Sequence, residues 1–115
     1  MYEEARNTCR IPVFPNVTVG WDPSPRTDPV GPWQPSVYPY SQELQGNTPE
    51  AFGSAMHRAV DRVSHLPGET MVTVNAWNEW TEGSYLEPDT VYGMRYLEEL
   101  RRAVSIAAPE TACVA

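Results

Sequence analysis

The sequence is short of basic residues and of long apolar stretches, and each shortage excludes a class of function. The 115-residue chain has only 8 basic residues and 15 acidic ones, which gives a net charge of −7 at pH 7. Proteins that bind nucleic acid or an anionic membrane surface present clustered positive charge, so we expect neither partner. No apolar run approaches the roughly 18 residues that a membrane span needs.

Potential metal ligands are also scarce. The two cysteines, Cys9 and Cys113, lie near opposite ends and form neither a zinc-binding spacing nor a CxxC motif. We expect free thiols, with a disulfide as the alternative. His57 and His65 have no second ligand at a suitable spacing, so solvated helical histidines are expected. No metal or cofactor is therefore predicted.

Proline, by contrast, is abundant. The chain has 12 prolines, and eight of them lie between residues 12 and 39. Residues 2–10 are predicted to form the end of a helix, which Pro12 stops. The β-branched segment 16–21 predicts a strand. The first three residues of this strand, Asn-Val-Thr, match the glycosylation sequon, but burial in a strand would prevent glycosylation. Residues 22–47 have no periodicity but contain Trp33, Tyr38 and Tyr40, which favours a functional loop over disorder.

The second half of the chain has clearer periodicity. Thr48 and Pro49 are typical of a helix start, and Pro67-Gly68 of its end. The apolar face of this helix is predicted to hold Phe52, Ala55, Met56, Ala59, Val60 and Val63. Residues 71–76 predict a second strand, and Asp89 or Thr90 is expected to cap a last helix. The apolar face of that helix would hold Tyr96, Leu97, Leu100, Val104 and Ala107.

Strands that alternate with helices predict an α/β fold with parallel strand pairing. Two parallel strands need further elements to cover them, and a (β/α)₈ TIM barrel takes ~250 residues. We therefore predict that residues 1–108 are a C-terminal fragment of such a barrel, about two β/α units, with a frayed tail over 109–115. A small independent α/β domain is the alternative.

In parallel α/β folds, functional groups gather at the carboxyl ends of the strands. Trp21, Asp22 and Arg26 follow the first predicted strand. Residues 77–88, WNEWTEGSYLEP, follow the second. Tryptophan faces pack on the C–H faces of sugars, and carboxylate, amide and guanidinium groups bond sugar hydroxyls. Both segments therefore indicate a carbohydrate site.

Glu79 and Glu82 are the predicted catalytic pair. Cleavage of a glycosidic bond commonly uses two carboxyl groups, and neighbouring aromatic side chains can raise the pKa of one of them. A solvated acidic loop is the alternative reading of the pair. A loop salt bridge between Asp22 and Arg26, and a cation held by acidic residues such as Glu87, are further alternatives.

The segment NAWNEWTEGSYLEPD, followed by YGMRYLEEL, resembles the C-terminal signature of a large family. That family includes the family-99 glycoside hydrolases, which are endo-α-mannosidases, and the WbsX-like proteins of polysaccharide biosynthesis. The upstream VGWDPSPR is similar to a second signature of the WbsX-like branch. The resemblance covers most of residues 12–105 and implies a TIM barrel to which this chain contributes the last two units.

By the same resemblance, Glu79 acts as a base on the sugar 2-hydroxyl, through an anhydro-sugar intermediate with retention. Glu82 is then the general acid and base. The matched positions Trp77, Asn78, Trp80 and Glu87 line the site, although Glu87 could instead brace the loop. Asp22 and Arg26 contact the substrate or brace their loop, next to Trp21 at the end of the first strand.

Two departures favour the WbsX-like branch over the mannosidases. Thr81 stands where the mannosidases have histidine, and residues 84–86 are Ser-Tyr-Leu instead of Thr-Gln-Ile. The expected activity is retaining cleavage of an oligo- or polysaccharide. The alternatives are a glycosyl-transferring or polysaccharide-biosynthesis protein and a non-catalytic sugar-binding fragment. The isolated fragment is expected to be inactive and to lack the remainder of its barrel.

Overall fold

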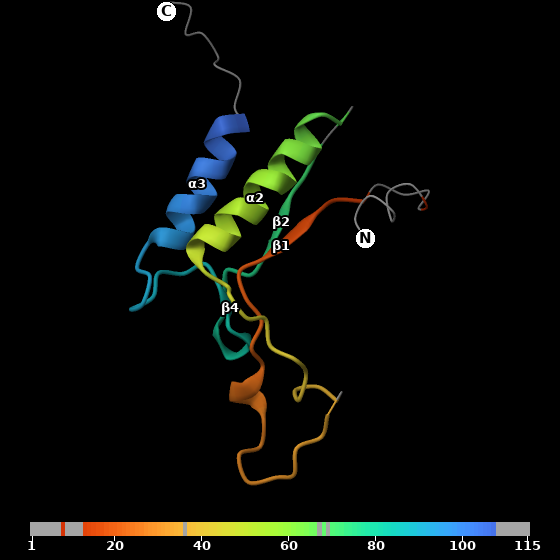
Figure 1. The fold of residues 1–115 in the computed structure, drawn as a ribbon, viewed down its shortest axis with the longest axis vertical. Helices are drawn as coiled ribbons and strands as arrows, with labels where there is room; N and C mark the ends of the chain where they lie inside the picture. Colours follow the sequence, from red (N-terminus) through yellow and green to blue (C-terminus); the bar gives the residue numbers. More distant parts are fainter. Residues whose placement is uncertain (1–7, 9–12, 36, 67, 69, 108–115) are drawn as a thin grey trace, which may run out of the picture.

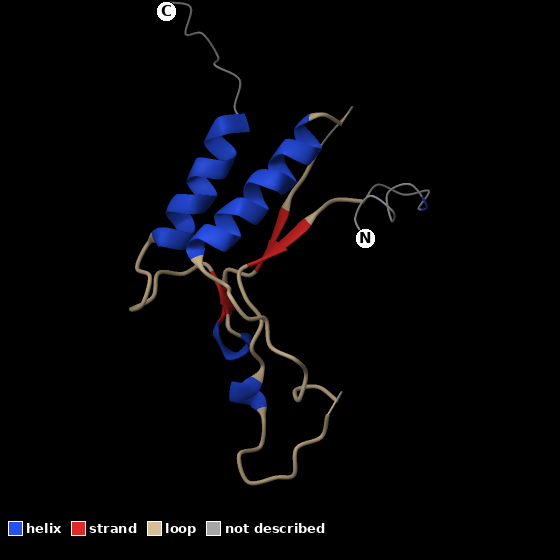
Figure 2. Cartoon of the chain, in the orientation of Figure 1, coloured by secondary structure: helices blue, strands red, loops and turns tan. Residues whose placement is uncertain are grey.

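The computed structural model describes residues 8, 13–35, 37–66, 68 and 70–107. Apart from Thr8, the helix expected over 2–10 lies outside these residues, as do the tail 109–115 and both cysteines. The described elements are β1 (Asn16–Thr18), the 3₁₀ helix η1 (Ser24–Arg26), α2 (Pro49–Ser64), β2 (Thr73–Asn75), β3 (Asn78–Glu79), the 3₁₀ helix η2 (Trp80–Glu82), β4 (Ser84–Tyr85) and α3 (Arg95–Ala107). Figures 1 and 2 show their arrangement.

The two longer strands pair in parallel, as the alternation of strands and helices predicts. β1 lies beside β2 with Val17 opposite Val74, and α2 connects the two strands. Both helices cover the same side of this strand pair (Figure 2). β3 and β4 form a separate antiparallel hairpin beyond the end of β2. The hairpin and both 3₁₀ helices were not predicted from the sequence.

Both parallel strands are shorter than the sequence predicts. The backbone N–H of Val19 still donates to the carbonyl of Asn75, at 2.8 Å, which is the last bond between the two strands. The hydroxyl of Thr18 then donates to the carbonyl of Gly20, and the chain turns toward the β3–β4 hairpin. The strand prediction over 16–21 was therefore too long at its C-terminal end, because β-branched residues do not reveal where pairing stops.

Helix α2 follows its sequence closely. The side chain of Thr48 accepts a hydrogen bond from the backbone N–H of Ala51 at 3.2 Å, and Pro49 occupies the first turn. All six predicted residues of the apolar face are buried or packed on the core: Phe52, Ala55, Met56, Ala59, Val60 and Val63. The predicted start and apolar face of this helix are confirmed. The helix ends at Ser64, and of the predicted stop signal Pro67-Gly68 the proline lies outside the described residues.

Helix α3 begins later than predicted. The carboxylate of Asp89 accepts hydrogen bonds from the backbone of Val91 and Tyr92, and so caps a tight turn instead of the helix. Gly93 completes this turn with a left-handed φ of 57°, and α3 starts at Arg95. Neither described helix is long and apolar enough to cross a membrane.

The core lies between the helices and the parallel strands. Val17 and Val19 of the first strand segment meet Phe52 and Met56 of α2, and Tyr96 of α3 packs edge-to-face on Phe52. On α3, Leu97 and Leu100 pack against the core as predicted, whereas Val104 is 48% exposed. The two helices run side by side and pack against each other along their length (Figure 1).

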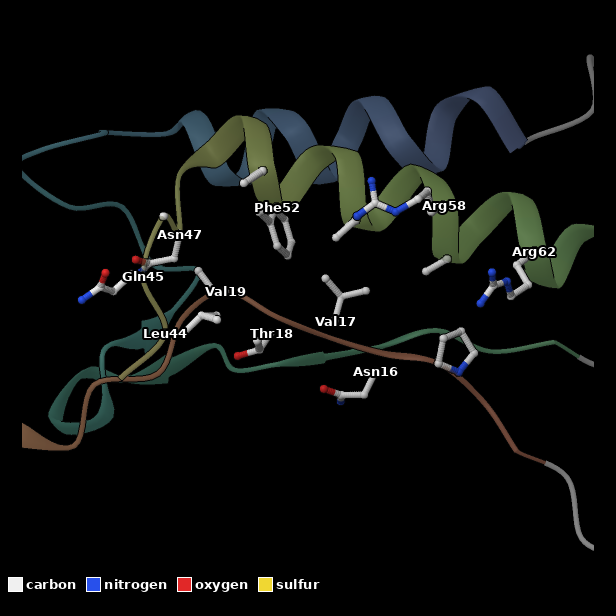
Figure 3. Close-up of a pocket in the computed structure, with 15 residues that line it drawn as sticks. Asn16, Val17, Thr18, Val19, Leu44, Gln45, Asn47, Phe52, Arg58 and Arg62 are labelled. Atoms are coloured by element: carbon white, nitrogen blue, oxygen red, sulfur yellow. The ribbon is translucent and has the colours of Figure 1, made fainter. Parts of the chain in front are cut away.

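One large pocket, of about 490 Å³, runs along the open edge of β1. Val17, Val19 and Phe52 form its apolar floor, and Arg58 and Arg62 stand at its rim (Figure 3). Neither of the two predicted catalytic glutamates lines it. This pocket is an uncovered part of the core and is separate from the candidate site.

Candidate functional site

Two loops meet beyond the carboxyl ends of β1 and β2. The first carries Asp22 and η1, and the second is the β3–η2–β4 hairpin. The backbone N–H of Asp22 donates to the carbonyl of Glu82 at 2.7 Å, which joins the two loops directly. Segments about 60 residues apart in the sequence therefore form one surface, at the position where parallel α/β folds carry their sites.

The hairpin is anchored to the end of β2 by a fully buried serine. The hydroxyl of Ser84 donates to the carbonyl of Asn75 at 2.8 Å and accepts from its side-chain amide at 3.1 Å. Gly83, with φ of 60°, makes the left-handed turn between η2 and β4. These contacts fix the path of the backbone that carries Glu79 and Glu82.

Arg26 joins the two glutamates. Its Nη2 donates to Glu79 Oε1 at 2.6 Å, and its Nε lies 3.7 Å from Glu82 Oε1. The same Nε donates to the hydroxyl of Thr81, which in turn donates to Glu79 Oε1 at 2.9 Å. The structure therefore brings together both predicted catalytic residues and Arg26, which comes from the other strand end.

The loop salt bridge considered between Asp22 and Arg26 was wrong. The Asp22 carboxylate instead accepts a hydrogen bond from the backbone N–H of Ser24 at 3.0 Å, which shapes the start of η1. Hydrogen bonding from Ser24, first from its side chain and then from this backbone N–H, lowers the pKa of Asp22 below its usual value. Arg26 is thereby left to pair with Glu79 across the loops.

Hydrogen bonds determine the electrostatics of Glu79. Aromatic neighbours were expected to raise the pKa of one glutamate of the pair, without naming which; at Glu79 the hydrogen bonds from Thr81 and then Arg26 lower the pKa. The side chain is 42% exposed, so burial opposes them only weakly. Glu79 is thus an anion at neutral pH, which suits a base and not an acid.

Tyr38 is a site residue that sequence reasoning missed. Its hydroxyl donates to Glu82 Oε1 at 2.7 Å, and the hydrogen bond to Glu82 raises the pKa of Tyr38. Glu82 itself is mostly covered, with a side chain 17% exposed. The only signal in the sequence was the set of aromatic residues in a proline-rich loop, which indicated function without naming a partner.

Several predicted site residues brace the hairpin or the long loop. Trp80 stacks on Tyr85, with ring centroids 3.7 Å apart, and its Nε1 donates to Glu87 Oε2 at 2.6 Å. Glu87 thus braces the loop, as its alternative reading held. Trp21 is half-buried, and its Nε1 donates to the hydroxyl of Ser41 at 3.2 Å.

Other predicted residues present free surface on the same hairpin. Trp77 is 55% exposed and Trp80 is 45% exposed, and the side chain of Asn78 is exposed too.

Among the described residues, no group of three or more histidines, cysteines, aspartates and glutamates is placed to hold a metal ion. His65 pairs with Asp61 on α2, with 3.5 Å between Nε2 and Oδ1.

Comparison with known proteins agrees with the sequence signatures. A family model described as glycosyltransferase WbsX matches residues 1–100. The chain belongs to the WbsX family. Two curated relatives, both called uncharacterized protein WxcX, come from the B100 and ATCC 33913 strains of Xanthomonas campestris pv. campestris. Each is 34% identical over 102 residues, which cover 87% of this chain.

The WbsX chain spans only 13% of the length of these curated relatives. No solved structure matches it. The expected resemblance to the WbsX-like branch is confirmed by the family match. The family's description, a glycosyltransferase, associates the family with carbohydrates. The glutamate pair and its partners, Arg26 and Tyr38, all lie within the matched residues.

Proposed function

We propose that this chain carries the two reactive glutamates of an enzyme that cleaves glycosidic bonds with retention. One observation supports this most directly: a single guanidinium contacts Glu79 and Glu82 at the carboxyl ends of two parallel strands. The flat, exposed faces of Trp77 and Trp80 beside this pair suit a sugar ring.

The proposed reaction has two steps. Glu79 removes the proton of the sugar 2-hydroxyl, and this oxygen attacks C1 to form a 1,2-anhydro sugar. Glu82 protonates the departing glycosidic oxygen as its bond to C1 breaks. In the second step Glu82 takes a proton from water, which attacks C1, and Glu79 returns its proton to the 2-oxygen. Two inversions at C1 give net retention.

Glycosyl transfer is the second candidate, and the family's name favours it. If an acceptor hydroxyl replaces water in the second step, the same two glutamates transfer the sugar instead of hydrolysing it. Electrostatics favour a neutral glycan as the sugar donor over a nucleotide sugar. A diphosphate would place negative charge near Asp22, Glu79 and Glu82, where Arg26 is already paired with a carboxylate.

The test is a product analysis with the full-length protein. Neutral oligosaccharides and 4-nitrophenyl glycosides are offered with and without nucleotide sugars, and ¹H NMR follows the first anomer formed. Release of a sugar with retained configuration supports the proposal. Turnover only in the presence of a nucleotide sugar would assign transfer from an activated donor instead, and glycan binding without turnover would indicate a binding module.

We expect Tyr38→Phe to lower kcat about tenfold while KM changes less than twofold, because Glu82 loses one charge-assisted hydrogen bond but keeps Arg26. Steady-state kinetics measure both values. Tyr92→Phe removes the same oxygen from a ring that packs on Tyr96 of α3, and it should change neither value. Equal effects of both substitutions would contradict the assignment.

We also propose that the two β/α units belong to a (β/α)₈ barrel. The parallel pairing of β1 and β2 supports this, and so does the uncovered apolar pocket along β1. A second apolar cleft, between β2 and both helices, includes Val72, Leu100 and Val104. Neighbouring units of a barrel would cover both surfaces.

The 115-residue chain on its own should therefore self-associate. Val104 and Met71 are both about half exposed beside the apolar cleft. Among the described residues, β1 and β2 each have a neighbouring strand on one edge only. Light scattering after size exclusion should give a mass well above the 12.9 kDa of the monomer. A monodisperse monomer with a sharp, cooperative thermal transition would contradict both this prediction and the barrel proposal.

A further inference from the structure

A second pocket, of about 340 Å³, lies in the loop that carries Tyr38. We call it the loop pocket; Asp22, Ser24, Trp33, Pro39, Gln42 and Glu43 contribute to its walls. Its volume is within the range of roughly 300–1,000 Å³ that ligand sites occupy. It belongs to neither the glutamate pair nor the apolar pocket along β1.

Two lining residues connect the loop pocket to Glu82. Pro39 directly follows Tyr38, whose hydroxyl donates to Glu82. Asp22 donates its backbone N–H to the carbonyl of Glu82. A glycan bound at the pair would therefore reach the loop pocket with the next units of its chain.

The chemistry of the walls suits a neutral sugar. Trp33 is 62% exposed, and together with Pro39 it offers an apolar surface for the C–H face of a ring. Asp22, Gln42 and Glu43 provide carboxylate and amide groups for hydroxyls at the ring edge. The two carboxylates disfavour phosphate or any other anionic ligand.

The loop that forms this pocket is held in place by side-chain and backbone contacts, although it has almost no regular structure. Tyr40 is buried, and its ring lies edge-to-face against Trp33 with centroids 5.0 Å apart. Trp21 bonds the loop twice, from its Nε1 to the hydroxyl of Ser41 and through its carbonyl to the N–H of Leu44. A pocket held in this way is formed before ligand arrives, which reduces the entropy lost on binding.

We propose that the loop pocket binds one sugar unit of a neutral glycan, next to the unit held at Glu79 and Glu82. The inference rests on the proposed function and refines it: the substrate is an oligosaccharide or longer chain and not a monosaccharide glycoside. Trp33 is the main contact, and the polar wall selects uncharged hydroxyl-rich ligands.

The test measures binding by calorimetry in full-length Glu82→Gln protein, so that turnover does not consume the ligand. The probes are manno-, gluco- and galacto-oligosaccharides of one to four units. In the series that binds, Trp33→Ala should weaken the affinity for the tetrasaccharide at least tenfold more than the affinity for the monosaccharide. Trp33→Phe should have an intermediate effect. Val30→Ala, in the same loop and 94% exposed, is the control and should change neither.

The outcomes separate this inference from the proposed reaction. Equal losses for short and long ligands in Trp33→Ala would overturn the subsite, as would the absence of binding in all three series. Cleavage by the wild type with an unchanged length preference in Trp33→Ala overturns the subsite and leaves the reaction intact. Length-dependent binding that needs Trp33, in a wild type without turnover, supports the subsite and refutes the reaction.

Discussion

Glu82→Gln should reduce kcat on an unactivated glycan by about a thousandfold, because a positioned acid and base contributes roughly 10²–10⁴ to the rate. Glutamine keeps the size of the side chain and can still accept the hydrogen bond from Tyr38, but it neither gives nor takes a proton. Ligand binding should persist, because Arg26 and Glu79 keep their 2.6 Å contact. Initial rates with the full-length protein measure the loss.

The leaving group shows whether Glu82 acts as an acid. The dinitrophenolate of a dinitrophenyl glycoside leaves without protonation. The loss of kcat in Glu82→Gln should therefore be far smaller with this substrate than with a natural glycan. Glu98→Gln, an equivalent change on the exposed side of α3, should leave the rates unchanged. Full activity of Glu82→Gln on every substrate would remove this residue from the mechanism.

Gly20→Ala should destabilise the full-length protein by about 2 to 3 kcal/mol, near the upper end of the usual cost of overpacking. A Cβ at this position would overlap the carbonyl oxygen of Gly83 and come within 2.7 Å of the side-chain amide of Asn47. The first of these is backbone, which cannot rotate away. Urea unfolding midpoints of variant and wild type measure the difference.

The same substitution should also impair the site. Gly20 lets the end of β1 approach the hairpin, and two residues later Asp22 bonds the carbonyl of Glu82. Forcing the loops apart would move Arg26 away from Glu79. Gly31→Ala is the control, because its added Cβ meets only the flexible side chain of Asp28. If both variants unfold at the same urea concentration, the close approach at Gly20 does not limit stability.

Some elements could be read from the sequence because their determinants lie within a few residues of one another. The cap, first turn and apolar stripe of α2 all lie within residues 48–63, and each was predicted correctly. The start of α3 was not, because the turn at Asp89 competes for the same capping side chain. Strand ends were misplaced for a related reason, since pairing depends on the partner strand.

Three features could be predicted from the residues alone: the parallel strand pair with its connecting helix, the resemblance to the WbsX family, and the position of Glu79 and Glu82 after the second strand. The groups that surround the two glutamates are set by the folded chain. Arg26 reaches Glu79 across 53 residues and Tyr38 reaches Glu82 across 44. Such contacts depend on the path of a long irregular loop, and no local periodicity or spacing encodes that path. Of these contacts, the one from Arg26 helps to lower the pKa of Glu79, whereas the sequence indicated only that aromatic neighbours could raise the pKa of one glutamate of the pair.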